Sequence, residues 1–488
     1  MGVFIRRIKS RNSTCFQIGQ KRYGKFVLLK HIGCATVPAE IEALRLKAKA
    51  ELGELLFKNQ LSLFSGVKIL PKAKLLSWQI TGYHQVFGAV YDRLGFPRNL
   101  LRDLVIGRIV YPKSKTATIR YLRRYLGIIL SKDKIYRFLD TLDKDALTRI
   151  AFNFVSAKNK GVSLLFYDVT TLHFETEIED DFRKKGFSKN YRTDVPQIMV
   201  GLFVDNEGYP LDFDFFEGSI FEGHTFPVAI KKIVGRHVFT SLTVVADAAM
   251  LSADNLEFLD SLNINYIVGA RLKNLPEAEI AKIHGHDFTK EAIFQITLKN
   301  QQLFIDYSPQ RAQKDAKVRE RLVKKLEIKL RKKEQVIRKS KYLRWESQGK
   351  IAGIDKKQIE ADRKFDGLKG YITNKNNNLG ANEVIKQYHN LWKVERAFRM
   401  SKSDLKERPI YHRYSSRIKS HLLVCFVSLL VMKETEKILN RKQYSLEKTI
   451  EVLGTVGQGK TQIGNVSLDI ESALDQETQS ILQLFTGH

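Results

Sequence analysis

The sequence predicts an α/β protein, and the order of its apolar segments is the first observation behind this prediction. Between residues 161 and 272, three apolar runs follow one another: VSLLFYDVTTL, QIMVGLFVD and YPLDFDFFEG. An amphipathic stretch to Arg236, the run SLTVVADAAML, a helical pattern near residues 253 to 262 and the run INYIVGARL come next. The second observation is composition, because 43% hydrophobic residues in a chain of 488 is typical of a globular protein with roughly two to four domains.

Three strands, a helix, a strand, a helix and a strand are the order of an RNase H-like sheet. Two aspartates lie on its predicted strands: Asp168 follows Leu164-Leu165-Phe166, and Asp247 follows the run from Thr243 to Ala246. A carboxylate in such a place costs free energy unless something pairs with it. Mg²⁺ is a suitable partner, because it prefers a few carboxylates together with water and phosphate oxygens. Each aspartate taken alone is explained equally well as a strand-end cap or a turn residue.

A third acidic residue lies in the segment from Tyr388 to Leu405, which lacks Gly and Pro. The segment predicts one amphipathic helix followed by a turn at Arg408-Pro409. At about 100° per residue, one face of this helix carries Tyr388, Trp392, Glu395, Arg399 and Lys402. An apolar stripe runs beside that face and consists of Leu391, Val394, Phe398 and Leu405. The helix can pack while it presents one carboxylate between an aromatic ring and two cations, although a solvated ion-pair face has the same pattern.

The spacing of Tyr388, Glu395 and Lys402 resembles the Y-x2-R-x3-E-x6-K signature of bacterial insertion-sequence DDE transposases, with Leu391 in place of the Arg. Further segments resemble the corresponding blocks of these transposases: YDVTTLHFE, GFSKNYRTDVPQIMVGLFVDNEGYPL, FFEGSIFEGHT, VVADAAML and the block from Tyr388 through RPIYH. The resemblance spans residues 160 to 435. It implies an RNase H-like catalytic core in which Asp168, Asp247 and Glu395 are the catalytic triad. It also implies that these carboxylates are the ligands of two Mg²⁺ ions, for which Mn²⁺ can substitute.

The charge balance favours nucleic acid as the partner. The chain has 82 Lys and Arg against 53 Asp and Glu, a formal net charge of +29, which is typical of a protein that neutralises phosphates. We expect DNA contacts from Tyr388, Lys402, Arg399, Trp392, Lys189 and Arg192. Lys393 or Arg399 are candidates for the charge that Leu391 lacks. The expected partners are the terminal inverted repeats of the element and target DNA, bound by a homodimer.

The apolar periodicity and the charge of the chain change at several points, which divide it into six predicted segments. Residues 1–75 form a small module of strands followed by a charged helix from about Pro38 to Leu56, and residues 76–158 form a helical, DNA-binding region. The catalytic core occupies residues 159–272 and 366–435, the second part with the Glu helix, and residues 436–488 form a C-terminal tail. The basic segment YPKSKTATIRYLRRYLG suits a DNA-binding helix. A basic solvated helix explains that segment nearly as well.

Residues 273–365 are predicted to be an insertion domain, because 147 residues separate Asp247 from Glu395. One helix and one strand need far fewer residues. The segment contains a strand-like run, QQLFIDYS, and a predicted helix from Arg311 to Arg344 with 15 Lys and Arg against 4 Asp and Glu. Too few acids are present to pair with so many cations, so we expect contacts with DNA phosphates.

Several other features predict absences. GTVGQGKT at 454–461 matches a phosphate-binding loop, but only 27 residues follow Thr461, so the match is interpreted as coincidence and no nucleotide is expected. His284-Gly285-His286 is interpreted as loop.

Three scattered cysteines favour neither a disulfide framework nor a zinc site. The apolar run from Leu422 to Met432 is too short for a membrane span and predicts a buried helix. With no secretory segment, the expected location is the cytoplasm.

These observations predict a DDE transposase that cleaves and transfers DNA strands at the ends of its insertion sequence. An RNase H-like nuclease without strand transfer would use the same triad. A non-catalytic DNA-binding protein would have the same charge. A joining assay separates the first alternative from the transposase, and metal dependence separates the second.

Overall fold

The computed structural model describes residues 2–63, 73–187, 193–250, 252–332, 341–345, 351–375, 377–408, 410, 412–463 and 466–486. The chain divides into two compact units. The first consists of Met1–Leu76 and Lys460–Leu468, and the second of Ser77–Gly459 and Asp469–His488.

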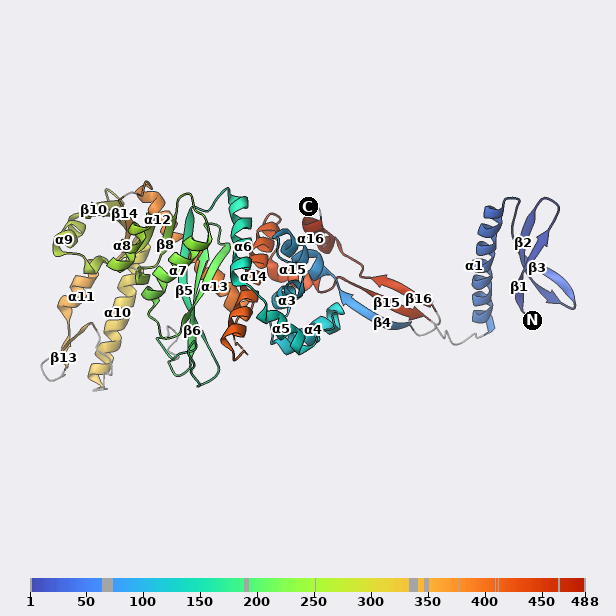
Figure 1. Ribbon diagram of the computed structural model, residues 1–488, viewed down its shortest axis with the longest axis horizontal. Coiled ribbons are helices and arrows are strands. Elements are labelled where there is room, and N and C mark those ends of the chain that lie inside the picture. The colour runs from blue at the N-terminus through green and yellow to red at the C-terminus, as the bar shows by residue number, and fades with distance from the viewer. Residues whose placement is uncertain are drawn as a thin grey trace. The chain divides into compact units, whose positions relative to one another are not determined.

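The first unit holds an antiparallel sheet and one long helix, α1 (Figure 1). The predicted strands and helix are confirmed, and the helix is longer than predicted: β1 (Val3–Lys9), β2 (Thr14–Arg22), β3 (Lys25–Ala35) and α1 (Pro38–Leu63). The expectation that the cysteines are too scattered to pair is wrong for two of them. Cys15 and Cys34 face each other across β2 and β3 and form a disulfide, because the strand register places them directly opposite.

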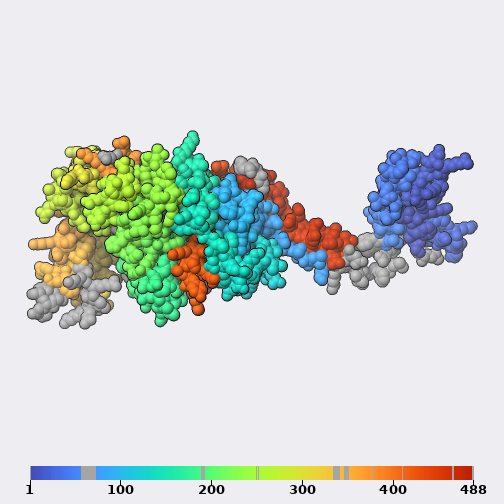
Figure 2. All heavy atoms as spheres, viewed as in Figure 1, coloured from blue at the N-terminus to red at the C-terminus, as the bar shows by residue number. Residues whose placement is uncertain are grey.

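A helical region opens the second unit, as the sequence predicts. Its elements are η1 (His84–Gly88), α2 (Ala89–Arg93), α3 (Leu100–Val110), α4 (Lys115–Leu126), α5 (Lys132–Asp140) and α6 (Lys144–Asn159). Asn99, Ser114, Ser131 and Asp143 begin α3 to α6 by accepting a backbone N–H in the first turn. In the space-filling view these helices and the neighbouring sheet form a continuous surface (Figure 2).

An eight-stranded mixed sheet forms the centre of the second unit, with the strand order β10-β11-β14-β9-β8-β5-β6-β7. The α/β prediction is confirmed, and the predicted order of three strands, helix, strand, helix and strand is present. These elements are β5 (Leu164–His173), β6 (Gln197–Val204), β7 (Pro210–Glu217), α7 (Glu222–Arg236), β8 (Thr243–Ala246), α8 (Ala253–Ser261) and β9 (Asn265–Ala270). β5, β8 and β9 run parallel, whereas β6 and β7 pair antiparallel beside β5.

Two strands from the segment predicted to be an insertion extend this same sheet. β10 (Ile293–Thr297) pairs with β11 (Gln301–Tyr307), and β11 pairs with β14 (Leu368–Asn374), which joins β9. The segment also contains η3 (Leu272–Asn274), α9 (Glu277–Gly285), α10 (Pro309–Arg331), β12 (Leu343–Trp345), β13 (Ile351–Ile354) and α11 (Lys356–Arg363).

Two sequence predictions in this segment are corrected. The basic helix does not reach Arg344, because α10 ends at Arg331 and Arg344 pairs with Gly353 in the β12–β13 hairpin. His284 and Gly285 belong to the last turn of α9 and are therefore not loop. Around the hairpin, Leu326, Tyr342 and Leu343 form a small hydrophobic cluster separate from the main core.

The last helices of the unit pack against the earlier ones. They are α12 (Ala381–His389), α13 (Trp392–Ser403), α14 (Ser415–Asn440), α15 (Leu446–Leu453) and α16 (Gln476–Thr486). The run from Leu422 to Met432 is buried throughout within α14, as predicted. Among the helices that the structure describes, none is long and apolar enough to cross a membrane.

The segment GTVGQGKT does not have the geometry of a phosphate-binding loop, which leaves a strand and opens a helix. It follows α15, and residues from Gly457 onward form β15 (Gly457–Ile463). β15 lies between β16 (Val466–Glu471) and β4 (Ala73–Ile80) in a three-stranded sheet. The lysine of the motif therefore lies within a strand, and the interpretation of the motif as coincidence is confirmed.

Candidate active site

Asp168 and Asp247 occupy matching positions on neighbouring parallel strands. The β5–β8 register pairs Phe166 with Val245 and Tyr167 with Ala246, and each aspartate is the next residue along the chain. Neighbouring strands lie about 4.8 Å apart, and equivalent positions direct their side chains to the same face. The register therefore places the two aspartates at neighbouring positions of the sheet.

Asp168 does not end its strand, in contrast to the simple pattern of an acid at a strand terminus. β5 continues for five residues to His173, and Asp168 pairs with Leu202 of β6. The β8 side of the pairing ends at Ala246, after which Asp247 begins the turn into the short helix η2 (Ala248–Met250). Asp168 is thus paired with β6 on one edge of β5, and on the other edge it lies next to the end of β8.

The Asp247 carboxylate is exposed but oriented by two hydrogen bonds to one oxygen. Its Oδ1 accepts from the backbone N–H of Ala248 at 2.7 Å and from the hydroxyl of Tyr388 at 3.1 Å. Tyr388 is itself buried, and burial followed by the negative charge of Asp247 raises the pKa of its hydroxyl. The hydroxyl therefore remains protonated and donates to Asp247.

The Tyr388 hydroxyl reaches Asp247 because β9 leaves room for it. A Cβ atom on Gly269 of β9 would lie 2.5 Å from the Tyr388 oxygen. The ring of Tyr371, on β14, packs edge-on against Tyr388 with 5.1 Å between centroids. A glycine on one strand and an aromatic ring on the next therefore fix the position of Tyr388.

The segment from Tyr388 to Leu405 is not one helix, so that prediction is wrong. α12 ends at His389, and α13 begins at Trp392 after a break at Asn390 and Leu391. The two helices pack on different strands: α12 contacts β8, β9 and β14, whereas α13 contacts β5 and β6. The predicted apolar stripe is confirmed, because its four residues are all buried.

α13 places Glu395 and Lys402 on the carboxylate side of the sheet. Glu395 lies exposed in the first turn, and its charge acts on Tyr388, beside Asp247. Lys402, in the last turn, donates through Nζ to the hydroxyl of Thr170, two residues beyond Asp168 on β5. Both residues are therefore near the strands that carry the aspartates.

Lys369, at the start of β14, is a further cation beside these groups, and the sequence analysis missed it. Its Nζ lies 4.5 Å from the centroid of the Tyr388 ring. Burial first, and then the charge of Arg311, lower its pKa, while Asp247 and Glu395 act in the opposite direction. The sequence does contain a signal for this residue: Lys369 is the one charged residue in the apolar strand LKGYITN.

Comparison of the sequence with known protein families identifies the family of this chain. The family described as "Transposase DDE domain" matches residues 160–431, more than half of the chain and the stretch that contains Asp168, Asp247 and Glu395. The chain belongs to the transposase DDE domain family. Its activity is therefore that of a transposase, and its function is DNA transposition. A search of curated proteins finds no match.

Among solved structures, the transposase is similar to a piggyBac transposase synaptic complex with hairpin DNA, determined by cryo-EM. The TM-score is 0.38, the sequence identity is 10%, and the similarity covers 76% of each chain. The assignment to the family rests on the match of residues 160–431.

DDE transposases generally depend on divalent metal ions, and the donor set of this transposase fits such ions chemically. Asp168, Asp247 and Glu395 supply carboxylate oxygens, the ligands that Mg²⁺ prefers. Among the described residues, however, no three His, Cys, Asp or Glu side chains are gathered closely enough to hold a metal. The sheet places the two aspartates at neighbouring positions, and Glu395 comes from α13, which packs on β5 and β6.

The other predicted DNA contacts are dispersed. Trp392 and Arg399 line a groove of about 870 Å³ between α13, α14 and α15, with Arg396 and Glu447. Lys189 and Arg192 lie outside the described residues. Among the predicted contact residues that the structure describes, Tyr388 donates a hydrogen bond to Asp247, and Lys402 donates one to a strand that carries an aspartate.

Leu391 is buried, so the position that departs from the signature faces the core. Lys393, one candidate for the missing charge, donates to the backbone carbonyl of Asn206. Arg399, the other candidate, lines the groove described above. Lys369 is the cation whose position beside Asp247 and Glu395 fits that role better.

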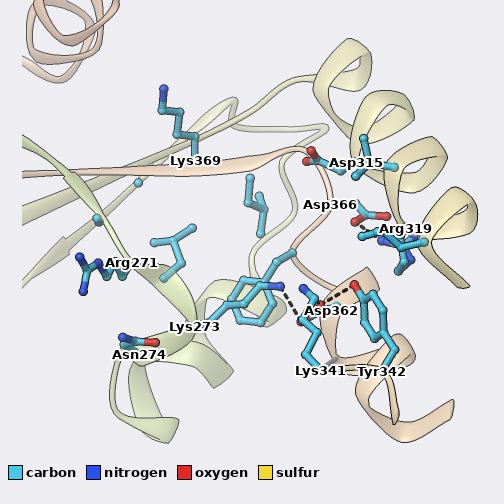
Figure 3. Close-up of a pocket in the computed structure, with 17 residues that line it drawn as sticks. Arg271, Lys273, Asn274, Asp315, Arg319, Lys341, Tyr342, Asp362, Asp366 and Lys369 are labelled. Carbon is cyan, nitrogen blue, oxygen red and sulfur yellow. Dashed lines mark hydrogen bonds and ion pairs between the residues drawn. The ribbon is translucent and has the colours of Figure 1, made fainter. Parts of the chain in front are cut away.

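A cavity of about 550 Å³ opens beside the ends of β9 and β14 (Figure 3). Two of its acids pair with cations: Asp366 pairs with Arg319, and Asp362 accepts from Lys273 at 2.5 Å and from the hydroxyl of Tyr342 at 2.7 Å. Although burial alone would raise the pKa of Asp362, these hydrogen bonds hold it well below the usual range. Figure 3 shows Lys369 directed away from this cluster. Ion pairs therefore occupy acids of this cavity, and Asp168, Asp247 and Glu395 do not line it.

Proposed function

We propose that the transposase binds the ends of its own insertion sequence and catalyses metal-dependent strand cleavage and strand transfer in the cytoplasm. Asp168, Asp247 and Glu395 are the proposed catalytic residues and metal ligands, on an RNase H-like core. The observation that carries the proposal is the matched placement of two aspartates on parallel strands, with one of them hydrogen-bonded to Tyr388.

Each residue of the site has a separate role. Asp168 and Asp247 offer carboxylate oxygens at neighbouring positions of β5 and the end of β8, and Glu395 offers a third carboxylate from α13, which packs on β5 and β6. The Tyr388 hydroxyl and the backbone N–H of Ala248 both donate to Oδ1 of Asp247, so Oδ2 is the proposed metal ligand. Two Mg²⁺ or Mn²⁺ ions, when bound, activate the attacking water or 3′-hydroxyl and stabilise the leaving oxygen.

The cations near the carboxylates position the DNA backbone. Lys402 is anchored on Thr170, and Lys369 is anchored over the Tyr388 ring, so both ammonium groups are held in place before DNA arrives. Pre-positioned cations lower the cost of ordering side chains on binding. Trp392, Arg399, Lys189 and Arg192 are proposed as more distant contacts. A homodimer is the proposed form that holds two element ends.

The test is a cleavage and joining assay with the full chain and duplexes taken from the DNA that flanks its reading frame. We expect Mg²⁺ and Mn²⁺ to support both steps, whereas Ca²⁺, with its looser coordination, should allow binding with little cleavage. Asp168→Asn, Asp247→Asn and Glu395→Gln should each abolish both steps and leave DNA binding intact.

The alternatives give different results in the same assay. Cleavage without joined product would identify a nuclease. Binding that never leads to metal-dependent cleavage would identify a non-catalytic DNA-binding protein. Near wild-type cleavage by any of the three variants would remove that residue from the proposed triad.

A further inference from the structure

The sheet of the first unit has two unlike faces. α1 covers one of them (Figure 1). Phe16 and Ile18 of β2 are buried on this side, and Gly33 of β3 faces Leu44 of α1, with Lys30 paired to Glu51 of the helix. Strand side chains alternate between faces, so Gln17, which lies between Phe16 and Ile18, points to the opposite side.

The opposite face carries a row of three polar side chains, one from each strand. Arg6 of β1 pairs in register with Gln17 of β2, and Gln17 pairs with His31 of β3. Directly paired residues lie on the same face. Arg6 and His31 are exposed, and Gln17 is half-buried between them. The row therefore crosses all three strands on the face that α1 leaves uncovered, beside an irregularity in the β2–β3 pairing, and both of its ends are exposed.

Aromatic rings next to this row hold Arg6 in place. Its guanidinium lies 4.6 Å from the centroid of the Phe26 ring, and Phe4 packs edge-on against the same ring. Phe26 can lie flat across β2 because residue 19 is glycine; a Cβ there would be 2.4 Å from the ring. The arginine is thus stacked before any partner binds, which reduces the ordering cost of a contact.

Charge identifies the partner as an anion. Residues 2–37, which make up the three strands and their turns, contain no Asp or Glu. They contain eight cations: Arg6, Arg7, Lys9, Arg11, Lys21, Arg22, Lys25 and Lys30. The four acids of residues 1–76 are Glu40, Glu42, Glu51 and Glu54, all on α1. The strands therefore present positive charge, and the acids are confined to the helix.

We infer that this uncovered face binds duplex DNA in the major groove and reads bases through Arg6, Gln17 and His31. The inference rests on the proposed function, in which the chain recognises the ends of its element. The major groove admits a β-ribbon, and Arg and Gln form bidentate pairs with guanine and adenine there. Cations along the strands and turns, such as Lys21 and Lys25, lie where the phosphate backbones would flank the sheet.

The experiment uses the full chain and two labelled duplexes of equal length: one from the DNA flanking the reading frame, and a scrambled version of it. Arg6→Ala and Gln17→Ala should each reduce the preference for the flanking duplex roughly 5- to 150-fold, the range of one bidentate base contact. Gln17→Ala, which removes no charge, should leave binding to the scrambled duplex unchanged. Lys47→Ala and Lys49→Ala, on exposed positions of α1, are the matched controls and should keep the preference.

Other outcomes overturn the inference. An unchanged preference in Arg6→Ala, Gln17→Ala and the more severe Gln17→Glu would refute it, as would a wild-type chain without any preference. A change of oligomeric state at unchanged preference would assign the face to a second copy instead. Circular dichroism confirms that each variant is folded. Metal-dependent cleavage of the flanking duplex, measured in parallel, tests the proposed function separately, because sheet variants that keep both cleavage and preference refute only this inference.

Discussion

Carboxylates occupy two different environments in the large unit of this transposase. On β7, Asp212 is 1% exposed and is paired with Arg236 at 2.8 Å and Lys144 at 3.4 Å. On α14, Glu434 is also buried and accepts from Lys158 and from Tyr209, both at 2.5 Å. Each of these acids already has cations or donors as permanent partners.

The carboxylates at the end of β8 differ in exposure and in partners. Asp247 is exposed, and the contacts to its Oδ1 come from a backbone N–H and the neutral hydroxyl of Tyr388. Glu395 is exposed in the first turn of α13. A carboxylate paired with cations in the core must break those pairs to bind anything else, whereas one held by neutral donors at the surface can accept a metal. Burial and partner charge thus separate structural acids from candidate catalytic acids of the same residue type.

The largest expected effect on stability is at the buried acids. Asp212→Ala removes the carboxylate that Arg236 and Lys144 share, although Arg236 keeps Asp145 and Lys144 keeps Asp214. Breaking a buried pair typically costs about 3–5 kcal/mol, and the remaining partners place this case at the lower end of that range. Hydrogen bonds and cations outweigh burial and lower the pKa of Asp212. Its contribution is therefore fully present above the unfolded pKa of about 3.9 and is lost as pH falls through the lower folded pKa.

Urea unfolding of the wild-type chain and Asp212→Ala checks this prediction at pH 7 and under acidic conditions. The difference between them should shrink as the pH falls below about 4. Glu257→Ala, on an exposed position of α8, is the control and should unfold like the wild type. An Asp212→Ala chain as stable as the wild type at pH 7 would show that the buried pairs contribute nothing.

A smaller effect, on activity rather than stability, is expected at Tyr388. Tyr388→Phe keeps the ring packing on Tyr371 but removes the donor to Asp247. Loss of a partner that orients a metal ligand typically costs about 10- to 100-fold. Cleavage by Tyr388→Phe should fall by that factor, and higher Mg²⁺ concentrations should partly restore it. If Tyr388→Phe cleaves at the wild-type rate and needs no higher Mg²⁺ concentration, Tyr388 does not orient Asp247.

The sequence predicts the strands that carry Asp168 and precede Asp247, because apolar runs are local patterns. It does not predict the break at Asn390 and Leu391, since the 3.6-residue periodicity continues across it while α12 and α13 pack on different strands. The Cys15–Cys34 bond and the position of Lys369 depend on strand register, which no local pattern encodes.

The charge on α10 gives a modest expected effect on DNA binding. Lys317, Lys324 and Lys325 are exposed on this helix. If each contacts one phosphate, replacing all three by Gln should lower the slope of log K against log salt by about 2.7, or about 0.9 for each contact. Binding titrations at several salt concentrations measure the slope. The same slope in the triple variant would mean that α10 is a solvated helix.

The smallest expected effect is at Lys460. Because this residue lies in β15, Lys460→Ala should leave cleavage and joining unchanged, with or without ATP. Loss of activity in this variant, or a requirement for ATP, would restore the nucleotide-binding interpretation of GTVGQGKT.

The most direct measurement compares Asp247→Asn with Asp212→Asn by two readouts, thermal unfolding and metal-dependent cleavage of flanking DNA. The account predicts that Asp247→Asn keeps the wild-type Tm and DNA affinity while its cleavage falls by more than about 100-fold, the upper range for loss of a partner that merely orients a ligand. It predicts that Asp212→Asn lowers the Tm, and that the fraction still folded cleaves at close to the wild-type rate. Near wild-type cleavage by Asp247→Asn, or loss of cleavage that follows only from unfolding, would contradict the assignment of the exposed carboxylates to catalysis.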